Sequence, residues 1–474
     1  MIVCGGVEIQ GLHSTVAPRR GIQAPATLEE YSFVPNTDNV DVFPSDLKKY
    51  TQGCLNYILE NLKIVIDQDK NGALQNKKIL QKILSDTKPS GSSNISSLVN
   101  IPNSGLAQTL EKVFTNANSN NLKENIKNLL NSSRSQLSSD CLLSSLSHEN
   151  ILKPCLDIVL ENLSTNKPSV FEVGAASSAL YRTIIPLITS HPLKNVNYIG
   201  SDSVPLDKDA KSLGVKSSQW TPDSSSVPPG KMHLLVLKNV LHKQTNIDDV
   251  MKNLSEMISP EGFILVEEVT KNYPLHLALD ALSESLPSFT DGVCRMCGRY
   301  LTEDSWVEVF TKHGYEIVYK KSDDLLSTMF LLRKKFSIPV KSLVFIDDLQ
   351  YSWLEDLKLK VKELDTAPET ERLWIAAKEN INGLAGFITC LRTEAGGSKI
   401  RSILISNFKS SSRVPAITVD SNEFQQLVQK DLVSNVFRDG QWGTFRHLPL
   451  SKGKNISSLY YFIKDCFILW KFLF

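Results

Sequence analysis

The chain has 474 residues, with 52 Lys and Arg against 51 Asp and Glu, and 41% of its residues are hydrophobic. This length allows about three domains with cores of their own, and the composition is that of an ordinary globular protein. The formal net charge of +1 excludes the strongly basic surface that binds nucleic acids or anionic membranes.

Residues 1–44 combine a strand-like segment with a proline-containing linker. The segment GGVEIQGLHSTVA alternates apolar and polar residues, and its partner strands are expected upstream of Met1. The N-terminus lacks a basic stretch followed by an apolar core, so we expect no signal peptide and a cytoplasmic location.

Residues 45–164 are predicted to form a helical subdomain. LKKYTQGCLNYILENLKIVI places apolar residues three and four apart, which is typical of an amphipathic helix. Further helices are expected at 76–86, 106–115, 121–131 and 149–163, with polar loops rich in Ser and Asn between several of them.

Residues 165–335 are predicted to form a doubly wound α/β sheet. Six short strand-like runs follow one another, several of them separated by helix-length segments, and the last two resemble a hairpin. The runs are SVFEV, NVNYIGSD, MHLLVLKNV, GFILVEEV, YEIVYKKS and STMFLLRKK.

Residues 336–435 show a second, shorter α/β pattern. We expect a strand at SLVFIDD, a long helix over ERLWIAAKENINGLAGFITCLRTEAGG, a strand at IRSILISNF and a helix beginning near VDSNEF. These are too few strands for a complete dinucleotide-binding sheet, so an exposed sheet edge or an exposed apolar face is predicted. FRDGQWGTFRHLPL is predicted to be a hairpin that begins a new β domain over 436–474.

The turn after the first strand of the doubly wound sheet, FEVGAASS, is a candidate cofactor loop. In such sheets the ligand lies beyond the carboxyl ends of the strands, near the switch point. Glu172 and Gly174 belong to this turn, and Asp202 at the end of the second strand could bind a ribose hydroxyl pair. Ala176 and Ser178 stand where close approach favours glycine, and a left-handed backbone there would cost about 1–2 kcal/mol per residue.

His242 in NVLH and Glu268 at the end of GFILVEE are candidate catalytic residues, because both follow neighbouring strands. Two interpretations are open. They form a general-base pair, or His242 caps a strand and Glu268 is a solvated strand end. We favour the second, because a base without a methyl donor has no reaction to serve.

Other motifs have structural explanations that are simpler than a ligand site. Cys294 and Cys297 form a C-x-x-C with only His313 nearby, so we expect two ordinary thiols and no metal. Asp347 and Asp348 are read as solvated carboxylates. The glycines at 383, 386, 396 and 397 do not form G-x-G-x-x-G after a strand, which favours helix packing and a C-cap over NADPH binding.

The sequence resembles class I S-adenosylmethionine-dependent methyltransferases in four features taken together. They are the E-x-G turn at Glu172, the acidic residue Asp202 after the second strand, the motif NVLH and the strand PEGFILVEE. The chain is most similar to the C-methyltransferase domains of polyketide synthases. In that family a His and a Glu act as a base dyad on an acyl-thioester α-carbon, and the matching residues here are His242 and Glu268.

Four blocks in order also resemble the central region of animal-type fatty acid synthase. GGVEIQGLHSTVAPRR with LEEYSFVP is similar to the end of the dehydratase. NGLAGFITCLRTEAGGSKIRSILISN is similar to a truncated pseudo-ketoreductase, and DLVSNVFRDGQWGTFRHLPL to the start of the enoyl reductase. The sequence after Leu450 diverges.

The resemblance implies an order of domains. It runs from the end of the dehydratase and a linker (1–44) through the helical subdomain (45–164) and α/β core (165–335) of a pseudo-methyltransferase. A truncated, Rossmann-like ketoreductase half-domain (336–435) and the start of an enoyl reductase with a divergent tail (436–474) follow.

The resemblance also implies a non-catalytic structural segment whose partners are the other synthase domains, above all the catalytic ketoreductase, in a homodimeric parent. No cofactor is then expected, because NADPH binds other domains. S-adenosylmethionine is expected only if a residual methyltransferase activity remains, with Glu172, Gly174 and Asp202 as its vestigial site.

Overall fold

The computed structural model describes residues 2–4, 7–9, 29–36, 45–68, 76–87, 91, 94–115, 122–190, 194–222, 230–283, 288–293, 295, 298–337, 340, 342–348, 350–378, 383–406 and 413–449. The chain divides into a small unit, residues 1–32 with 447–474, and a large unit, residues 33–446. In the small unit β1 (Ile2–Cys4) pairs antiparallel with β2 (Val7–Ile9). The divergent tail after Leu450 lies outside the described residues.

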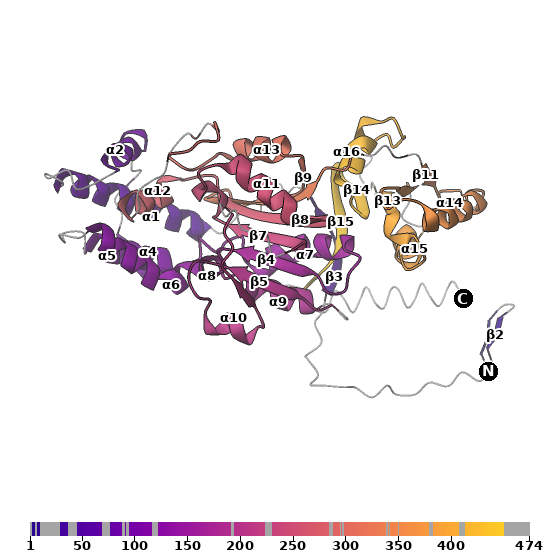
Figure 1. The fold of residues 1–474 in the computed structure, drawn as a ribbon, viewed down its shortest axis with the longest axis horizontal. Coiled ribbons are helices and arrows are strands. Elements are labelled where there is room, and N and C mark those ends of the chain that lie inside the picture. Colours follow the sequence, from indigo (N-terminus) through magenta and orange to yellow (C-terminus); the bar gives the residue numbers. More distant parts are fainter. Residues whose placement is uncertain are drawn as a thin grey trace. The chain divides into compact units, whose positions relative to one another are not determined.

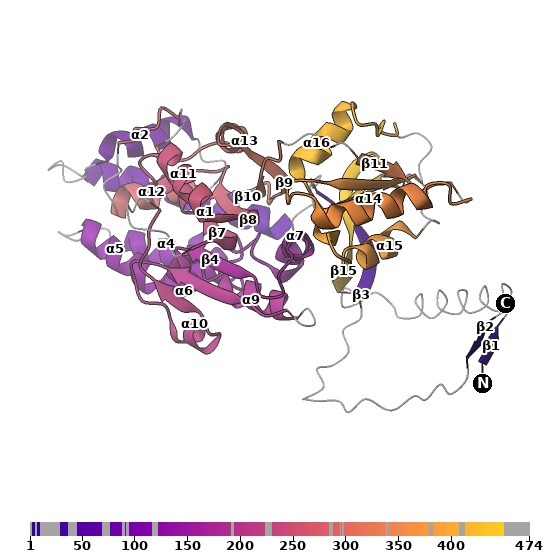
Figure 2. The ribbon, with the colours of Figure 1, turned by 45° about the vertical axis from the view of Figure 1, so that its right-hand side comes forward.

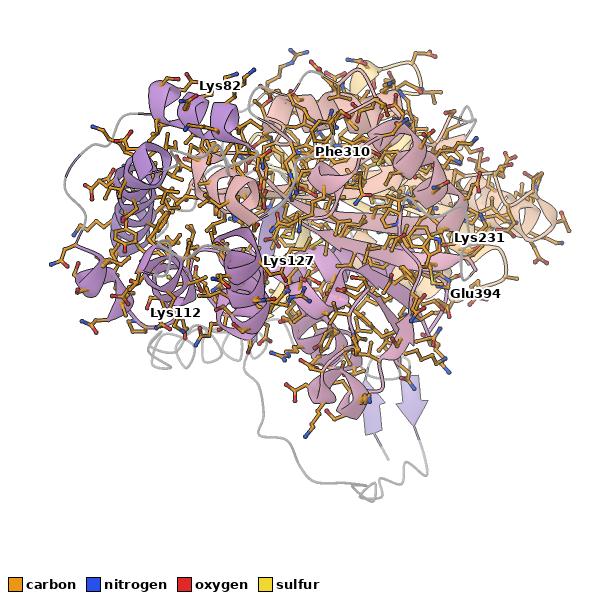
Figure 3. All side chains as sticks on the ribbon, turned by 60° about the vertical axis from the view of Figure 1, so that its left-hand side comes forward. Lys82, Lys112, Lys127, Lys231, Phe310 and Glu394 are labelled. Carbon is orange, nitrogen blue, oxygen red and sulfur yellow. The ribbon has the colours of Figure 1, made fainter. Side chains whose placement is uncertain are left out.

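The predicted helices of the N-terminal part of the large unit are confirmed. They are α1 (Ser45–Gln68), α2 (Lys77–Asp86), α4 (Gly105–Thr115), α5 (Leu122–Ser132) and α7 (Glu149–Asn162); the short α3 (Ile95–Val99) and α6 (Arg134–Ser138) were not predicted. Buried faces of α1 to α5 share one core with α12 (Pro274–Ser283), and Figure 1 shows these helices gathered at one end of the large unit. Lys82, Lys112 and Lys127 project outward from them (Figure 3).

The α/β part is built on a seven-stranded sheet. Its strands are β4 (Ser169–Val173), β5 (Asn197–Ser201), β6 (Lys216–Ser218), β7 (Met232–Lys238), β8 (Ile258–Val269), β9 (Tyr315–Ser322) and β10 (Ser327–Lys334). The order is β6-β5-β4-β7-β8-β10-β9, in which the first five are parallel and β10 is antiparallel to both neighbours. Because β5 and β7 lie on opposite sides of β4, the strand order reverses there, as a doubly wound fold requires.

Helices cover both faces of this sheet. Residues of β8 alternate between two cores: Phe263 and Leu265 contact the core of α7 and α9 (Tyr181–Thr189), whereas Ile264 and Val266 contact that of α11 (Ile247–Met257) and α13 (Glu303–Lys312). Phe310 of α13 is fully buried in the second core (Figure 3). The predicted methyltransferase-like fold class is therefore confirmed.

A six-stranded sheet forms the C-terminal part of the large unit. Its strands in spatial order are β11 (Ser342–Phe345), β12 (Leu373–Ala377), β13 (Ile400–Ile405), β14 (Ser434–Arg438), β15 (Gln441–Pro449) and β3 (Glu29–Pro35). The core clusters place α14 (Leu354–Thr366) and α15 (Leu384–Leu391) on one face and α16 (Asn422–Lys430) on the other (Figure 2). Among the described strands, β11 to β14 are parallel and follow chain order, so this sheet lacks the reversal at which dinucleotides bind.

The single long helix predicted over 371–397 is wrong. Its first part is β12, all five of whose residues are buried, and among the described residues of the second part α15 is the one α-helix. A short apolar run such as LWIAA cannot be assigned to a buried strand or a buried helix from periodicity alone. The helix α14 that precedes it was also not predicted.

The predicted hairpin near residue 440 is present, but it continues the six-stranded sheet. Asp439 and Gly440 form its turn with positive φ angles of 51° and 91°. Because β14 pairs with β13 as well as with β15, the predicted boundary at 435/436 falls inside a strand. β11 lies at one edge of the sheet, in agreement with the predicted exposed edge.

Candidate functional site

The switch point between β4 and β7 brings the predicted cofactor turn to the carboxyl ends of the strands. Gly174 has a left-handed φ of 74°, and a Cβ there would lie 3.4 Å from Val240 Cγ2. The Gly174 N–H donates to the Ser201 carbonyl over 2.8 Å. A glycine is therefore favoured by the backbone conformation, whereas a Cβ would make only an ordinary van der Waals contact.

Glu172 lies directly before this turn and is fully buried. Its carboxylate accepts hydrogen bonds from Leu180 N (2.8 Å), Tyr181 N (3.0 Å), Tyr198 Oη (2.7 Å) and Ser178 Oγ. These four donors occupy the lone-pair sites of a carboxylate. Glu172 therefore fixes the first turn of α9 and has no acceptor left for a ligand.

Asp202 follows β5, and its carboxylate also accepts hydrogen bonds from backbone N–H groups of the chain. Its Oδ2 accepts from Ala176 N over 3.0 Å, and its Oδ1 from Val204 N over 3.2 Å. The Ala176 N–H, which a cofactor at the strand ends would meet, is thus already bound. As it stands, the turn does not fit S-adenosylmethionine, because Glu172 has no acceptor left and the Ala176 N–H is bound to Asp202. Asp202 itself is half-buried and keeps unused acceptor sites.

The sequence-based explanation for the altered turn is wrong in one respect. The cost considered for Ala176 and Ser178 applies only if both positions are left-handed, and both lie in the short right-handed helix α8 (Ala175–Ser178). The strained position is Ala179, with φ 49° and ψ 28°. Ser178 does not replace a required glycine; its hydroxyl donates to Glu172.

The candidate residues His242 and Glu268 lie in contact, as the interpretation that we did not favour requires. His242 lies in the short helix η1 (Leu241–Lys243) after β7, and its Nδ1 is 2.6 Å from Glu268 Oε2. Glu268 Oε1 accepts from Val240 N (3.0 Å) and Leu241 N (2.7 Å). Glu268 is fully buried, so the interpretation of this residue as a solvated strand end is wrong.

An aromatic cluster surrounds the His242 ring. Tyr300 stacks on it with ring centroids 4.7 Å apart, and His276 meets the edge of Tyr300 at 6.3 Å. The Tyr300 hydroxyl donates to Asp280 Oδ2 over 2.6 Å. Burial lowers the pKa of His276 to about 4, with Asp280 opposing the shift. Arg299 lies 3.6 Å from Asp280 and, despite burial, helps to lower the pKa of that carboxyl.

The sequence did not single out this cluster. His276 and Asp280 are four residues apart in α12, a spacing that places both on one face of a helix and could have suggested a pair. Tyr300 carries no such signal, because it lies 20 residues beyond Asp280 in the sequence and meets it only in the folded chain.

The other residues that the sequence analysis considered as ligands contact the chain itself wherever the structure describes them. Cys294 and Cys297 lie outside the described residues. His313 Nε2 contacts Asp248 at 2.8 Å. Asp347 accepts from Lys378 N and Asp348 from Gln350 N and Ser352 N. The described part of the chain holds no cluster of three or more residues suited to a metal ion.

The interpretation of the glycines is confirmed for two of the four. A Cβ at Gly396 would lie 2.8 Å from the Leu364 carbonyl carbon of α14, and one at Gly397 would lie 2.4 Å from Leu391 O. Gly383 caps the start of α15 rather than its end, and a Cβ at Gly386 would meet nothing within 4 Å.

Within the described residues, no helix has the length and apolar character needed to cross a membrane.

Residues 350–450 match a family model described as fatty acid synthase, pseudo-KR domain, where KR denotes ketoreductase. The chain is also 26% identical over 102 residues to the highly reducing polyketide synthase PKS6 of Gibberella zeae. It is 25% identical over 158 residues to equisetin synthetase eqxS of Fusarium heterosporum. The chain is a central region of a multifunctional synthase of the fatty acid and polyketide type.

The matched region is a small part of the length of each curated relative. The matches cover 21% and 31% of the chain but only 4% of each relative. The family match runs to residue 450 and so includes the β14–β15 hairpin, which was expected to begin an enoyl reductase.

Two solved structures similar to the synthase segment are methyltransferases. The citrinin polyketide synthase CMeT domain is 14% identical, with a TM-score of 0.49, and the match covers 61% of this chain and 90% of that one. The CurJ carbon methyltransferase is 16% identical, with a TM-score of 0.49, covering 60% and 91%.

Proposed function

We propose that the chain is a non-catalytic structural segment of an animal-type fatty acid synthase, joining its dehydratase to its reductase domains. The observation that carries this proposal is the closed cofactor turn. Glu172 accepts four hydrogen bonds from its own chain, and Asp202 binds Ala176 N. A methyl donor would have to displace these bonds before it could bind.

The pseudo-ketoreductase sheet supports the same role. Among its described strands there is no reversal of order at which NADPH could lie, and β11 presents an edge on which a partner strand could pair. The other domains of the synthase are the partners of this segment. Within that set, we assign the edge to the catalytic ketoreductase of a homodimeric parent.

The contact between His242 and Glu268 favours a second candidate, a residual S-adenosylmethionine-dependent C-methyltransferase that acts on a carrier-bound acyl thioester. A buried carboxylate that fixes one ring nitrogen of a histidine is the arrangement of a general base. This candidate requires Asp202 and Glu172 to release their present partners first.

A methyl-transfer assay separates the two candidates. The chain is incubated with methyl-labelled S-adenosylmethionine and a β-ketoacyl pantetheine thioester, beside a His242→Ala variant. The structural role predicts equal, background label in both samples. Label transfer that is lost in His242→Ala would establish the second candidate instead.

A further inference from the structure

A buried ionic cluster joins the methyltransferase-like part of the chain to the pseudo-ketoreductase part. Its centre is Asp431, which ends α16 in a left-handed conformation (φ 47°) and is 3% exposed. Three arginines surround it: Arg372 and Arg401 belong to the pseudo-ketoreductase, whereas Arg333 comes from β10 of the methyltransferase-like sheet.

Two of these arginines bind the Asp431 carboxylate through paired contacts. Nε of both Arg401 and Arg372 lies 2.8 Å from Oδ1, and Nη2 of both lies 3.0 Å from Oδ2. Arg333 instead donates through Nη1 to the Asp431 carbonyl over 2.6 Å, with Nη2 3.5 Å from the carboxylate. Arg333 is therefore the member of the cluster that crosses between the two sheets.

Asn162, the last residue of α7, extends this crossing contact. Its Oδ1 accepts from Arg333 Nη1 over 2.8 Å and from Val433 N over 2.9 Å. Leu432 lies between these bonds and packs in the same core as α7 and α9. A short stretch of the pseudo-ketoreductase is thus seated in the methyltransferase-like part by both polar and apolar contacts.

The cluster holds three cations against one carboxylate, and its excess charge is offset by carbonyl oxygens and by the Glu261 carboxylate, which acts on Arg333 and Arg401. Arg372 Nη1 donates to Glu369 O and Glu371 O, and Arg401 Nη1 to Ser398 O over 2.7 Å. Burial would raise the pKa of Asp431, but Arg401, Arg372 and Arg333 outweigh it and lower that pKa to about 2. Removal of one partner from such a buried set leaves an unpaired charge, which is strongly destabilising.

We propose that Asn162, Arg333 and Asp431 form a rigid joint that makes the methyltransferase-like and pseudo-ketoreductase parts unfold as one unit. Domains in one chain move independently by default unless a strong interface holds them. The inference rests on the proposed structural role and deepens it, because a segment that spaces catalytic domains needs a stiff connection at this junction.

The test follows the two parts separately in the intact chain. Trp306 in α13 and Trp374 in β12 are both fully buried and report one part each. Fluorotryptophan labelling and fluorine NMR during urea unfolding should show a single shared midpoint in the unmodified chain. In Arg333→Met the Trp374 midpoint should fall below that of Trp306 by roughly 1 M urea, because a buried charged contact is lost.

Arg372→Met is the matched control, because it removes an Asp431 partner that lies within the pseudo-ketoreductase. It should lower stability without separating the two midpoints. Should Arg333→Met fail to fold, Asn162→Ala removes a second contact between the two parts, the bond from Val433 N, and takes one acceptor from Arg333. It leaves the contact of Arg333 with Asp431 in place, and it should separate the midpoints in the same direction by a smaller amount.

The proposed joint would be contradicted if the two urea midpoints stayed together in Arg333→Met and Asn162→Ala. It would also be contradicted if the midpoints already differed in the unmodified chain. S-adenosylmethionine binding by the unmodified chain would instead contradict the structural role and leave the joint unaffected. The two failures are therefore distinguishable.

Discussion

Glu172 shows how single residues determine the chemistry available at the strand ends. A buried carboxylate with four donors acts as an anchor for α9 rather than as a ligand for a nucleoside. Ser178 supplies one of these donors from the turn itself. The hydroxyl is thus part of the structure of the turn, and its removal should loosen the turn rather than reopen a site.

We expect the double change Ala176→Gly and Ser178→Gly to lower the free energy of unfolding and to produce no binding of S-adenosylmethionine. Loss of a hydrogen bond to a buried carboxylate costs about 1–3 kcal/mol. Urea unfolding and calorimetry measure the two effects. Ser177→Gly, at an exposed position of the same helix, is the control and should show only the smaller propensity cost. Saturable binding in the double variant would show that glycine alone had been missing.

His276 provides a pH-dependent test of the aromatic cluster. Burial holds its pKa at about 4, below the ordinary value of 6.5, with nearby Asp280 opposing this shift and His242, Lys243 and Lys238 adding to it. The folded state therefore binds fewer protons than the unfolded state between these two pH values. Stability should fall as the pH is lowered from about 6.5 to about 4, by roughly 3 kcal/mol in total.

The measurement for His276 is the free energy of urea unfolding at several pH values in that window. His276→Gln removes the titrating group and should flatten the dependence. If the free energy of unfolding of the variant falls with pH as steeply as that of the unmodified chain, the pH dependence comes from groups other than His276.

At the scale of elements, close packing between backbones decides where glycine is required. Gly397 is buried against the end of α15, whereas Gly386 lies within the same helix with open space beside it. The two positions belong to one short region, and therefore form a matched pair.

Gly397→Ala should destabilise the chain, because its Cβ would lie 2.4 Å from Leu391 O and the backbone would have to move. Gly386→Ala should stabilise it by up to about 1 kcal/mol, since alanine is the better helix former. Thermal or urea unfolding of both variants measures the difference. Equal effects at the two sites would contradict the packing explanation.

Elements with a clear period were predictable, and contacts made by distant segments were not. The alternation of strands and helices placed His242 and Glu268 at neighbouring strand ends, but the interpretation favoured from the sequence, a strand cap and a solvated strand end, missed the contact between them. Tyr300 and Arg333 act through contacts that depend on tertiary folding, which no local pattern encodes. The conformation of Ala179 was missed because the absence of glycine does not reveal which turn residue takes the left-handed position.

At the scale of the whole molecule, the large unit combines two sheets, and they differ in whether their described strands form a switch point at which a ligand could bind. The seven-stranded sheet keeps a switch point, but its own side chains and backbone close the turn there. The described part of the six-stranded sheet has no switch point, and it is joined to the first by the cluster around Asp431. Both features suit a segment that positions other domains of a synthase.

The most direct test of this structural role is calorimetric titration of the unmodified chain with S-adenosylmethionine and with its demethylated product, S-adenosylhomocysteine. The closed turn predicts no saturable heat for either compound at low-micromolar concentrations. Binding of either one in that range, with one site per chain and loss of the heat in Asp202→Ala, would contradict the account.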